Sequence, residues 1–271
     1  MAKSAPTMKI LMLHGYTQNG GLFHAKTRAM EKHLEKSFPG VSLTYPTGPV
    51  HLKPGDVPGF DPNHPSRASD SEDMQAYGWW RRSDTSDPPE YVGLENGLEV
   101  VSKILASEGP FDGVMGFSQG AGLAAMVTSL LEGESRQKAF QNQQSNSSLA
   151  IEYPSSFAKL NHPPLKFAIF YCGFVAPGER YTGFYEPHIS TPSCNFIGSL
   201  DSVVDESRTQ ALVDACGGSS KTQVLVHPGG HFVPSAKQYL NAIVSFIKNA
   251  TTPQSGQKEV EERAEDMDVP F

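Results

Sequence analysis

The sequence predicts an α/β fold with a mostly parallel central sheet of about six strands and helices on both faces. Short apolar runs, of the length of buried strands, alternate along the chain with segments whose apolar residues recur at helical spacing. Of the 271 residues, 38% are hydrophobic and 19% are charged, which is an ordinary globular composition. A single domain over residues 1–250 is therefore expected, within the size at which one core stays continuous.

The first β-α-β unit is expected over residues 8–45. Met8–Leu13 is a short apolar run that ends at His14-Gly15, which is typical of a buried parallel strand. The apolar residues that follow at helical spacing are Phe23, Met30, Leu34 and Phe38. Pro39-Gly40 ends this helix, and Val41–Tyr45 is the second expected strand.

Residues 46–93 are a long connection, rich in Pro, Gly, Asp and Ser, for which a lid-like loop is the expected structure. Trp79 and Trp80, which are the two tryptophans of the whole chain, both lie within it. Because exposed indole rings would be costly, this loop is expected to fold back over an apolar surface.

A helix, a strand and a second helix are expected next. The apolar residues of the first helix recur at helical spacing: Leu94, Leu98, Val101, Ile104 and Leu105. Gly109-Pro110 ends that helix before the strand Phe111–Met115, and an Ala-rich helix follows from Ala121 to Leu131. Residues 132–164 are polar and rich in Gln, Ser and Asn, which predicts a mobile insertion rather than a core element.

Three further strands, a last helix and a tail complete the expected order. Apolar runs at Phe167–Cys172, Ser193–Ile197 and Gln223–Val226 are the expected strands. The last helix, over residues 235–249, has its apolar residues on one face. Residues 251–271 are acidic, lack a sustained apolar stripe and are expected to form a disordered tail.

Ser118 stands in Gly116-Phe117-Ser118-Gln119-Gly120, which matches the G-x-S-x-G pattern of the nucleophile elbow. In an elbow, a strand turns sharply into a helix and holds the serine in a strained conformation. Glycines are needed there because a β-carbon would collide with the neighbouring strand or helix. An apolar strand precedes the motif and an Ala-rich helix follows it, as an elbow requires. A glycine-rich turn whose serine caps the helix is the alternative interpretation.

A serine hydroxyl needs a base within reach and a third group that orients the base, in the chain order Ser, then Asp or Glu, then His. His231 is the predicted base because it lies in a loop between an expected strand and the last helix, whereas His227 is interpreted as structural. Asp201 is the predicted acid because it follows a strand at the carboxyl end of the sheet. Asp205 precedes a helical pattern and is interpreted as an N-cap.

Two backbone N–H groups are expected to stabilise the negative charge that develops on a substrate's carbonyl oxygen. Gln119, which directly follows the serine at a helix N-terminus, is one predicted donor. The second donor is expected in the loop after the first strand, with Tyr16 as the first choice and Thr17 as the second. The alternative to an oxyanion loop that begins at His14-Gly15 is an ordinary turn at the end of the strand.

With these residues placed, the chain resembles the α/β-hydrolase superfamily, and specifically the fungal FSH-type serine hydrolases with related small esterases and polyketide-releasing thioesterases. The shared stretches, in order, are ILMLHGYTQNG, YPTGP, YGWWR, GFSQGAGLAA, KFAIF, GSLDSVV and HPGGHFVP. The resemblance implies an α/β-hydrolase fold with a Ser118-Asp201-His231 triad. It also implies hydrolysis of carboxylic esters or thioesters through an acyl-enzyme on Ser118, without a cofactor. A non-catalytic binding module on the same fold and a serine peptidase are the alternatives.

Trp79, Trp80 and Arg81 are the predicted substrate-binding residues. The two indoles would bury an acyl chain, which predicts a preference for medium or long acyl groups. Arg81 and Arg82 would meet a carboxylate or a phosphate-bearing acyl carrier, with a solvated pair of charges as the alternative. The expected partner is therefore a small ester or acyl thioester, free or attached to a carrier.

The remaining bulk properties exclude several classes of function. A formal net charge of -7 disfavours binding to nucleic acid or to an anionic membrane. No apolar run approaches the ~20 residues of a membrane span, and no secretory signal is recognised, so a cytoplasmic location is expected. The three scattered cysteines, and the lack of H-E-x-x-H, paired C-x-x-C and G-x-x-x-x-G-K motifs, predict neither a metal nor a nucleotide cofactor.

Overall fold

The computed structural model describes residues 8–58, 75–83, 85–217 and 221–252. A six-stranded sheet in the order β10-β9-β8-β7-β1-β2 forms its centre. The strands are β1 (Lys9–Leu13), β2 (Ser42–Thr44), β7 (Gly113–Phe117), β8 (Phe167–Tyr171), β9 (Ser193–Gly198) and β10 (Thr222–His227). Every neighbouring pair runs parallel, which confirms the predicted sheet.

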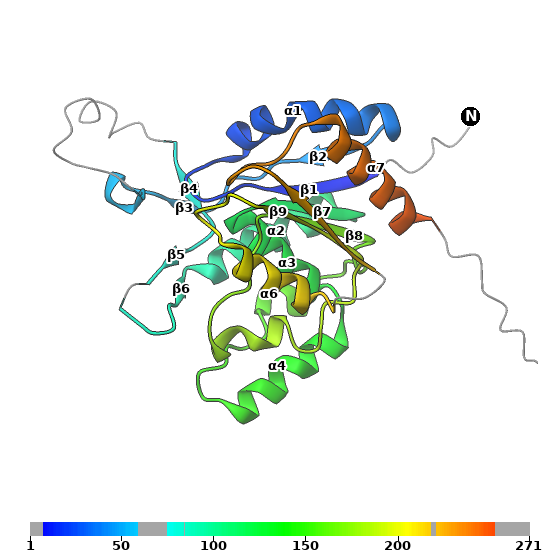
Figure 1. Cartoon of the computed structure of the whole chain (residues 1–271). Helices are drawn as coiled ribbons and strands as arrows, with labels where there is room; N and C mark the ends of the chain where they lie inside the picture. The colour runs from blue at the N-terminus through cyan, green and yellow to red at the C-terminus, as the bar shows by residue number, and fades with distance from the viewer. Residues whose placement is uncertain (1–7, 59–74, 84, 218–220, 253–271) are drawn as a thin grey trace, which may run out of the picture.

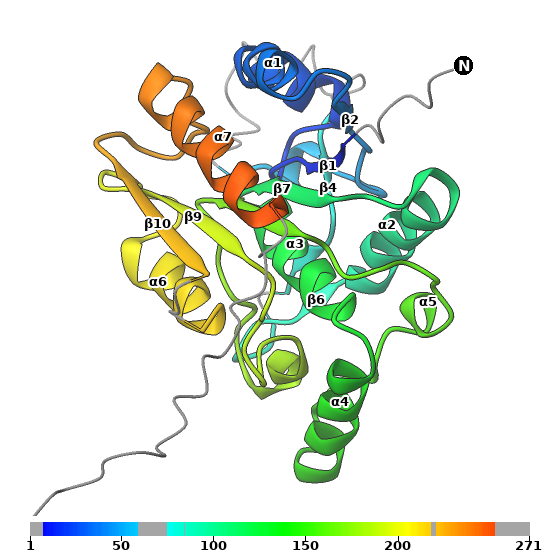
Figure 2. The ribbon, with the colours of Figure 1, turned by 90° about the vertical axis from the view of Figure 1, so that its right-hand side faces the viewer.

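Helices cover both faces of this sheet (Figure 1). Helices α1 (Gly20–Ser37) and α7 (Lys237–Thr251) lie on one face, and α2 (Leu94–Glu108), α3 (Gln119–Leu130) and α6 (Glu206–Ala215) lie on the other, as Figure 2 also shows. Along β1 the side chains alternate between two apolar cores: Ile10 packs with α1 and α7, whereas Leu11 packs with α2 and α3. Both faces of the strand are therefore buried, which explains why its sequence is a continuous apolar run.

The long connection after β2 folds back onto the domain, as its tryptophans predict. Two short antiparallel pairs organise its described part: β3 (Val50–His51) with β4 (Tyr77–Gly78), and β5 (Arg81–Arg82) with β6 (Tyr91–Val92). A 3-10 turn, η1, spans Pro54–Asp56. Trp79 and Trp80 are both buried, in the same core as α2 and α3.

Residues 132–164 differ from the expectation of a mobile polar insertion. They contain helices α4 (Glu134–Asn146) and α5 (Ser155–Ala158), which bury Phe140 and Phe157 in the core around α3. The ring of Phe140 meets the ring of Phe184 edge to face at 4.9 Å, where η2 (Glu179–Phe184) packs against α4. The polar composition of the segment misled the prediction because these few aromatic contacts, rather than an apolar stripe, attach it.

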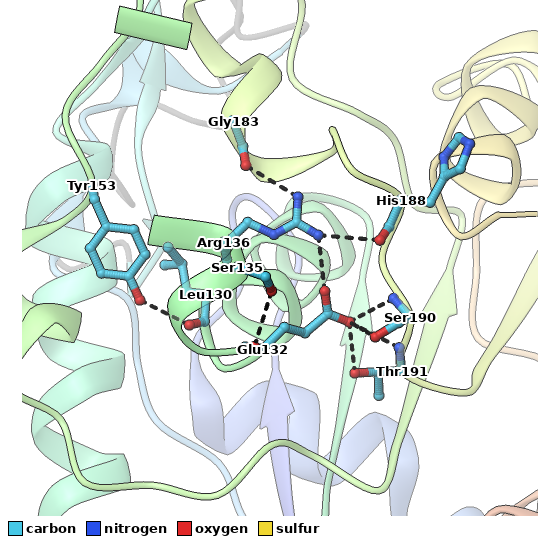
Figure 3. A network of polar contacts seen from close by, with 9 residues as sticks. All are labelled: Leu130, Glu132, Ser135, Arg136, Tyr153, Gly183, His188, Ser190 and Thr191. Atoms are coloured by element: carbon cyan, nitrogen blue, oxygen red, sulfur yellow. Dashed lines mark hydrogen bonds and ion pairs between the residues drawn. The ribbon is translucent and has the colours of Figure 1, made fainter. Parts of the chain in front are cut away.

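A buried ion pair also holds this segment in place (Figure 3). The side chains of Arg136 and Glu132 are 1% and 9% exposed, and their nearest charged atoms are 2.9 Å apart. Glu132 Oε1 accepts hydrogen bonds from the backbone N–H and the hydroxyl of both Ser190 and Thr191. Arg136 also donates to the backbone carbonyl of Gly183. Two charges can remain buried here because polar groups of the protein replace much of their hydration.

Two further expectations concern the acidic tail and membrane-spanning helices. Most of the predicted acidic tail, residues 253–271, lies outside the described residues. Within the described ranges, no helix has the length and the apolar character that crossing a bilayer requires.

Candidate active site

Ser118 occupies the tight turn between β7 and α3, and its backbone is strained. Its φ of 54° and ψ of -118° lie in a region that residues other than glycine rarely adopt. The turn is held in the sheet because the Ser118 N–H donates to the Tyr171 carbonyl at 2.8 Å. A β-carbon at Gly116 would lie 2.2 Å from the Gly120 oxygen, and one at Gly120 would lie 2.2 Å from the Leu13 oxygen. The flanking glycines are therefore needed for the close packing of strand and helix.

A continuous chain of hydrogen bonds joins Ser118, His231 and Asp201. His231 Nε2 lies 2.9 Å from Ser118 Oγ, and His231 Nδ1 lies 2.7 Å from Asp201 Oδ2. With Nδ1 protonated and donating to the carboxylate, Nε2 is free to accept the serine proton. The three residues come from the carboxyl ends of β7, β9 and β10, as the sequence predicts for a site at this edge of the sheet.

Asp201 is held as a carboxylate by the groups around it. Its Oδ1 accepts the backbone N–H groups of Val203 at 2.8 Å and Val204 at 2.9 Å. Burial alone would raise the pKa of Asp201, but hydrogen bonds from His231, these amides and the Cys172 thiol outweigh it and lower the pKa. The carboxylate therefore keeps its charge beside the imidazole.

Cys172 is a neighbour of this group that the sequence did not single out. It follows β8 with a φ of 50°, and its pKa is raised to about 12, mainly by burial and then by Asp201. The sulfur therefore stays a thiol that donates to the carboxylate. Its Sγ and one ligand atom each of Asp201 and His231 lie within 4.8 Å of one another. Because Asp201 and His231 are already paired, this cluster is better described as a hydrogen-bonded support than as a metal centre.

The two alternative residues serve other roles. Asp205 caps α6, where its side chain accepts the Arg208 N–H at 3.1 Å, and it is exposed. His227 is buried at the end of β10, with its ring centroid 4.9 Å from that of Phe232. Burial lowers the pKa of His227, which keeps the ring neutral. Neither side chain hydrogen-bonds to Ser118 among the described contacts.

The predicted oxyanion donors also lie beside the serine. Tyr16 and Gln119 line the same cavity as Ser118, and Gln119 is the first residue of α3. Within the described residues, neither backbone N–H donates to a protein acceptor, so both are available to a ligand. The dipole at the start of α3 further favours negative charge at this position.

His14 fixes the loop that carries Tyr16, a role that its sequence position did not reveal. The ring is fully buried, and burial lowers its pKa to about 4. The neutral ring donates from Nδ1 to the Gly15 carbonyl at 2.8 Å and accepts the Gly48 N–H at Nε2, at 2.9 Å. His14 thus connects the first strand to the long connection that follows β2.

The side chain of Gln119 and the indole of Trp79 hold the long connection against the elbow. Gln119 Oε1 accepts the Trp79 backbone N–H at 2.7 Å, and Gln119 Nε2 donates to the Trp80 carbonyl at 3.0 Å. The indole Nε1 of Trp79 donates to the His14 carbonyl at 2.9 Å. A glutamine inside G-x-S-x-G could have suggested such a clamp, since its side chain must find partners when buried.

The structure separates the three residues predicted to bind substrate. Trp79 is 0% exposed and belongs to the core beneath the site, whereas Trp80 lines a cavity at Ser118. Arg81 lines neither cavity at Ser118, because it is engaged with Asp56 at 3.1 Å and with the His51 carbonyl at 2.9 Å. Consecutive residues of an extended segment point to opposite sides, so the three could not share one wall.

Two cavities of similar size meet at Ser118. The histidine-side cavity, of about 600 Å³, is lined by Tyr16, Thr17, Gln18, Phe23, Lys26, Val57, Pro58, Phe117, Ser118, Val203, His231, Phe232 and Val233. The arginine-side cavity, of about 590 Å³, is lined by Tyr16, Asp56, Pro58, Trp80, Arg82, Pro89, Tyr91, Ser118, Gln119, Phe174, Val175, Pro177, Val203, Val204 and Arg208. A substrate bound at the serine can therefore extend in two directions.

Comparison with known proteins assigns the chain to a family. The sequence model of the family described as serine hydrolase (FSH1) matches residues 2–243. The chain belongs to this family. A relative, Esterase OVCA2 of Danio rerio, is 34% identical over 90% of this chain and 98% of its own length.

Two further likenesses are more limited in what they show. A protein of Schizosaccharomyces pombe named dihydrofolate reductase is 31% identical over 91% of this chain, but the chain spans only 48% of that protein's length. Among solved structures, acyl-protein thioesterase 2 of Zea mays superposes with a TM-score of 0.57 at 18% identity, over 92% of this chain and 96% of that one. This structural likeness confirms the α/β-hydrolase fold.

Proposed function

We propose that this chain hydrolyses carboxylic esters or acyl thioesters through an acyl-enzyme on Ser118. The observation that carries the proposal is the unbroken chain of hydrogen bonds from Ser118 through His231 to Asp201, at a strained turn that opens on two cavities. A nucleophile, a base and an orienting acid in this order are what acyl transfer requires.

In the proposed first half-reaction, Ser118 Oγ attacks the substrate's carbonyl carbon while His231 Nε2 accepts the serine proton. The negative charge that forms on the carbonyl oxygen is stabilised by the N–H groups of Tyr16 and Gln119. The intermediate then collapses, the bond to the leaving group breaks, and His231 returns the proton to the departing oxygen or sulfur.

In the second half-reaction, a water molecule attacks the acyl-enzyme and His231 accepts one of its protons. Collapse of this second intermediate releases the carboxylic acid, and the proton returns to Ser118 Oγ. Asp201 remains ionised throughout and stabilises the imidazolium that forms twice in each cycle.

The relatives support this reaction class without fixing the leaving group. The Danio rerio protein is named an esterase, and the Zea mays structure an acyl-protein thioesterase. The same attack on a carbonyl carbon cleaves either bond, so both remain part of the proposal. Carrier-bound acyl groups and a cytoplasmic location stay predictions from the sequence.

The proposal is tested with pairs of oxygen esters and thioesters that share one acyl group, assayed with the wild type and with Ser118→Ala. We expect saturable hydrolysis of at least one series by the wild type and its loss in the variant. Hydrolysis of peptides but not of esters would favour a peptidase. Binding of the esters without turnover would indicate a non-catalytic module.

A further inference from the structure

The two cavities at Ser118 differ in which half of a substrate they can receive. In the proposed reaction His231 protonates the leaving group, so that group must depart on the side where His231 lies. His231 lines only the histidine-side cavity, whereas the oxyanion donor Gln119 lines only the arginine-side cavity. The leaving group therefore belongs in the histidine-side cavity, and the acyl group belongs in the arginine-side cavity.

The walls of the arginine-side cavity suit a hydrocarbon chain for part of its length. Trp80 and Tyr91 stack with their ring centroids 4.6 Å apart, and Phe174 and Val204 provide further apolar surface. Methylene groups of an acyl chain would lose contact with water against these side chains.

Two arginines bring positive charge to this cavity, and neither forms a close ion pair with a described acid. Arg208 is half-buried, with its guanidinium carbon 4.7 Å from the centre of the Phe174 ring, and Arg82 lines the same cavity. Among the described residues, no carboxylate lies within 4.0 Å of either guanidinium.

Three acids near this cavity already have partners. Asp205 accepts hydrogen bonds from the Ser207 hydroxyl and the Arg208 backbone N–H at the exposed cap of α6, and these bonds, helped by the charge of Arg208, lower its pKa. Asp56 pairs with Arg81 at 3.1 Å, and Glu90, next to Tyr91, pairs with Arg180. Burial raises the pKa of Tyr91, while Arg208 and then Arg82 act against that rise, so both guanidinium groups lie close enough to influence one phenol. Because neither Arg82 nor Arg208 is held in a close ion pair among the described residues, both guanidinium groups can still bind a carboxylate of a ligand.

We propose that the acyl group accepted by this enzyme carries a carboxylate beyond an apolar stretch, and that Arg208, with Arg82, binds that carboxylate. The proposal rests on the hydrolase activity proposed above and names its substrate class: esters or thioesters of dicarboxylic acids, cleaved at one end. A planar guanidinium that donates two parallel hydrogen bonds is well suited to a carboxylate, and the half-buried position of Arg208 strengthens the pairing.

The test compares half-thioesters of five- to ten-carbon dicarboxylic acids with thioesters of monocarboxylic acids of equal length and the same neutral thiol. At the best length, we expect kcat/KM to favour the carboxylated substrate by about 10-fold or more, the range of a charge-assisted hydrogen bond. Arg208→Gln should reduce this ratio about 10-fold, with the neutral substrate as the internal reference. Arg28→Gln, which removes the same charge from α1, should leave the ratio unchanged.

Three results would overturn the inference. Equal or better turnover of the neutral thioesters, lost in Ser118→Ala, would leave the hydrolase standing and refute the carboxylate site. A preference for a carboxylate on the thiol instead would place the charge on the side of Lys26, in the histidine-side cavity. If neither thioester series is hydrolysed, the inference fails, and the proposed activity fails with it only if the matching oxygen esters are not cleaved either.

Discussion

Two networks of polar side chains in this domain differ in the groups at which they end. In the first, Arg136 and Glu132 tie α4 to the segment before β9, and one Glu132 oxygen alone accepts four hydrogen bonds. In the second, Asp201 and His231 lead to Ser118 Oγ, which lies where two cavities meet. The first network ends on groups of the protein itself, whereas the second ends on a hydroxyl that faces open space.

The difference shows how similar interactions serve different purposes. A buried ion pair whose carboxylate accepts four hydrogen bonds from the protein fixes the position of a segment. A network that ends on an exposed nucleophile, at a strained backbone, keeps one proton free to move. We therefore expect substitutions in the two networks to affect different quantities, and the predictions below separate activity from stability.

The largest expected effect is on activity, at Asp201. Asp201→Asn should lower kcat by about 10³- to 10⁴-fold, because the amide can no longer hold the imidazole in its working tautomer or stabilise the imidazolium. The unfolding midpoint in urea should change far less. The matched control is Asp205→Asn, at the exposed cap of α6, which should leave kcat within about two-fold of the wild type. If the Asp205 change were the more damaging one, the assignment of the acid would be wrong.

The next effect is on stability, at Arg136. Arg136→Met should lower the free energy of unfolding by about 3–5 kcal/mol, because Glu132 is left buried without its partner. Urea denaturation measures this change, and kcat/KM per folded molecule should stay close to that of the wild type. Lys103→Met is the control: it removes an exposed pair with Glu99, and exposed pairs contribute about 1 kcal/mol or less. Equal losses in both variants would contradict the buried role of Arg136.

A smaller effect is expected at His14, on the stability of the protein at acidic pH. The pKa of His14 falls from 6.5 to about 4 on folding, so between these values the unfolded chain binds a proton that the folded chain does not. Stability is therefore complete above pH 6.5 and should fall by about 3 kcal/mol towards pH 4. Denaturation curves of the wild type and of His14→Asn at several pH values measure this difference. A variant that kept the full acid dependence in this range would refute the role of His14.

The smallest effect is expected at Cys172. Cys172→Ala removes one of several donors to the Asp201 carboxylate, so kcat/KM should fall by about 10-fold or less. Cys172→Ser, which keeps a donor, should restore much of the loss. Cys194→Ala is the control: it removes another buried thiol and leaves a similar cavity, so it should affect stability rather than kcat/KM. If the serine and alanine variants at position 172 have equal activities, the hydrogen bond from the Cys172 thiol to Asp201 does not contribute to kcat/KM.

The sequence was most informative where local patterns determine structure. The six strands and the turn at Ser118 follow from apolar runs and glycines, whose consequences act within a few residues. Residue order and loop position were also sufficient to select Asp201 and His231, the two residues that the structure brings to the serine.

The expectations from the sequence were wrong where a residue's neighbours come from distant parts of the chain. Trp79 was expected in a pocket wall, but its indole finds an acceptor at His14, 65 residues away, and is buried. Residues 132–164 were expected to be a mobile insertion, but Glu132 in this segment accepts hydrogen bonds from Ser190 and Thr191. Nothing in the local sequence shows such partners, because each is supplied by the packing of other elements.

The central claim, an activated nucleophile at Ser118, is tested most directly by labelling with a fluorophosphonate, followed by intact mass measurement and peptide mapping. We predict rapid addition of one label to the wild type, on the peptide that contains Ser118, and much slower addition to Asp201→Asn. A folded wild-type protein that stays unlabelled, or that carries the label on another serine, would contradict the claim.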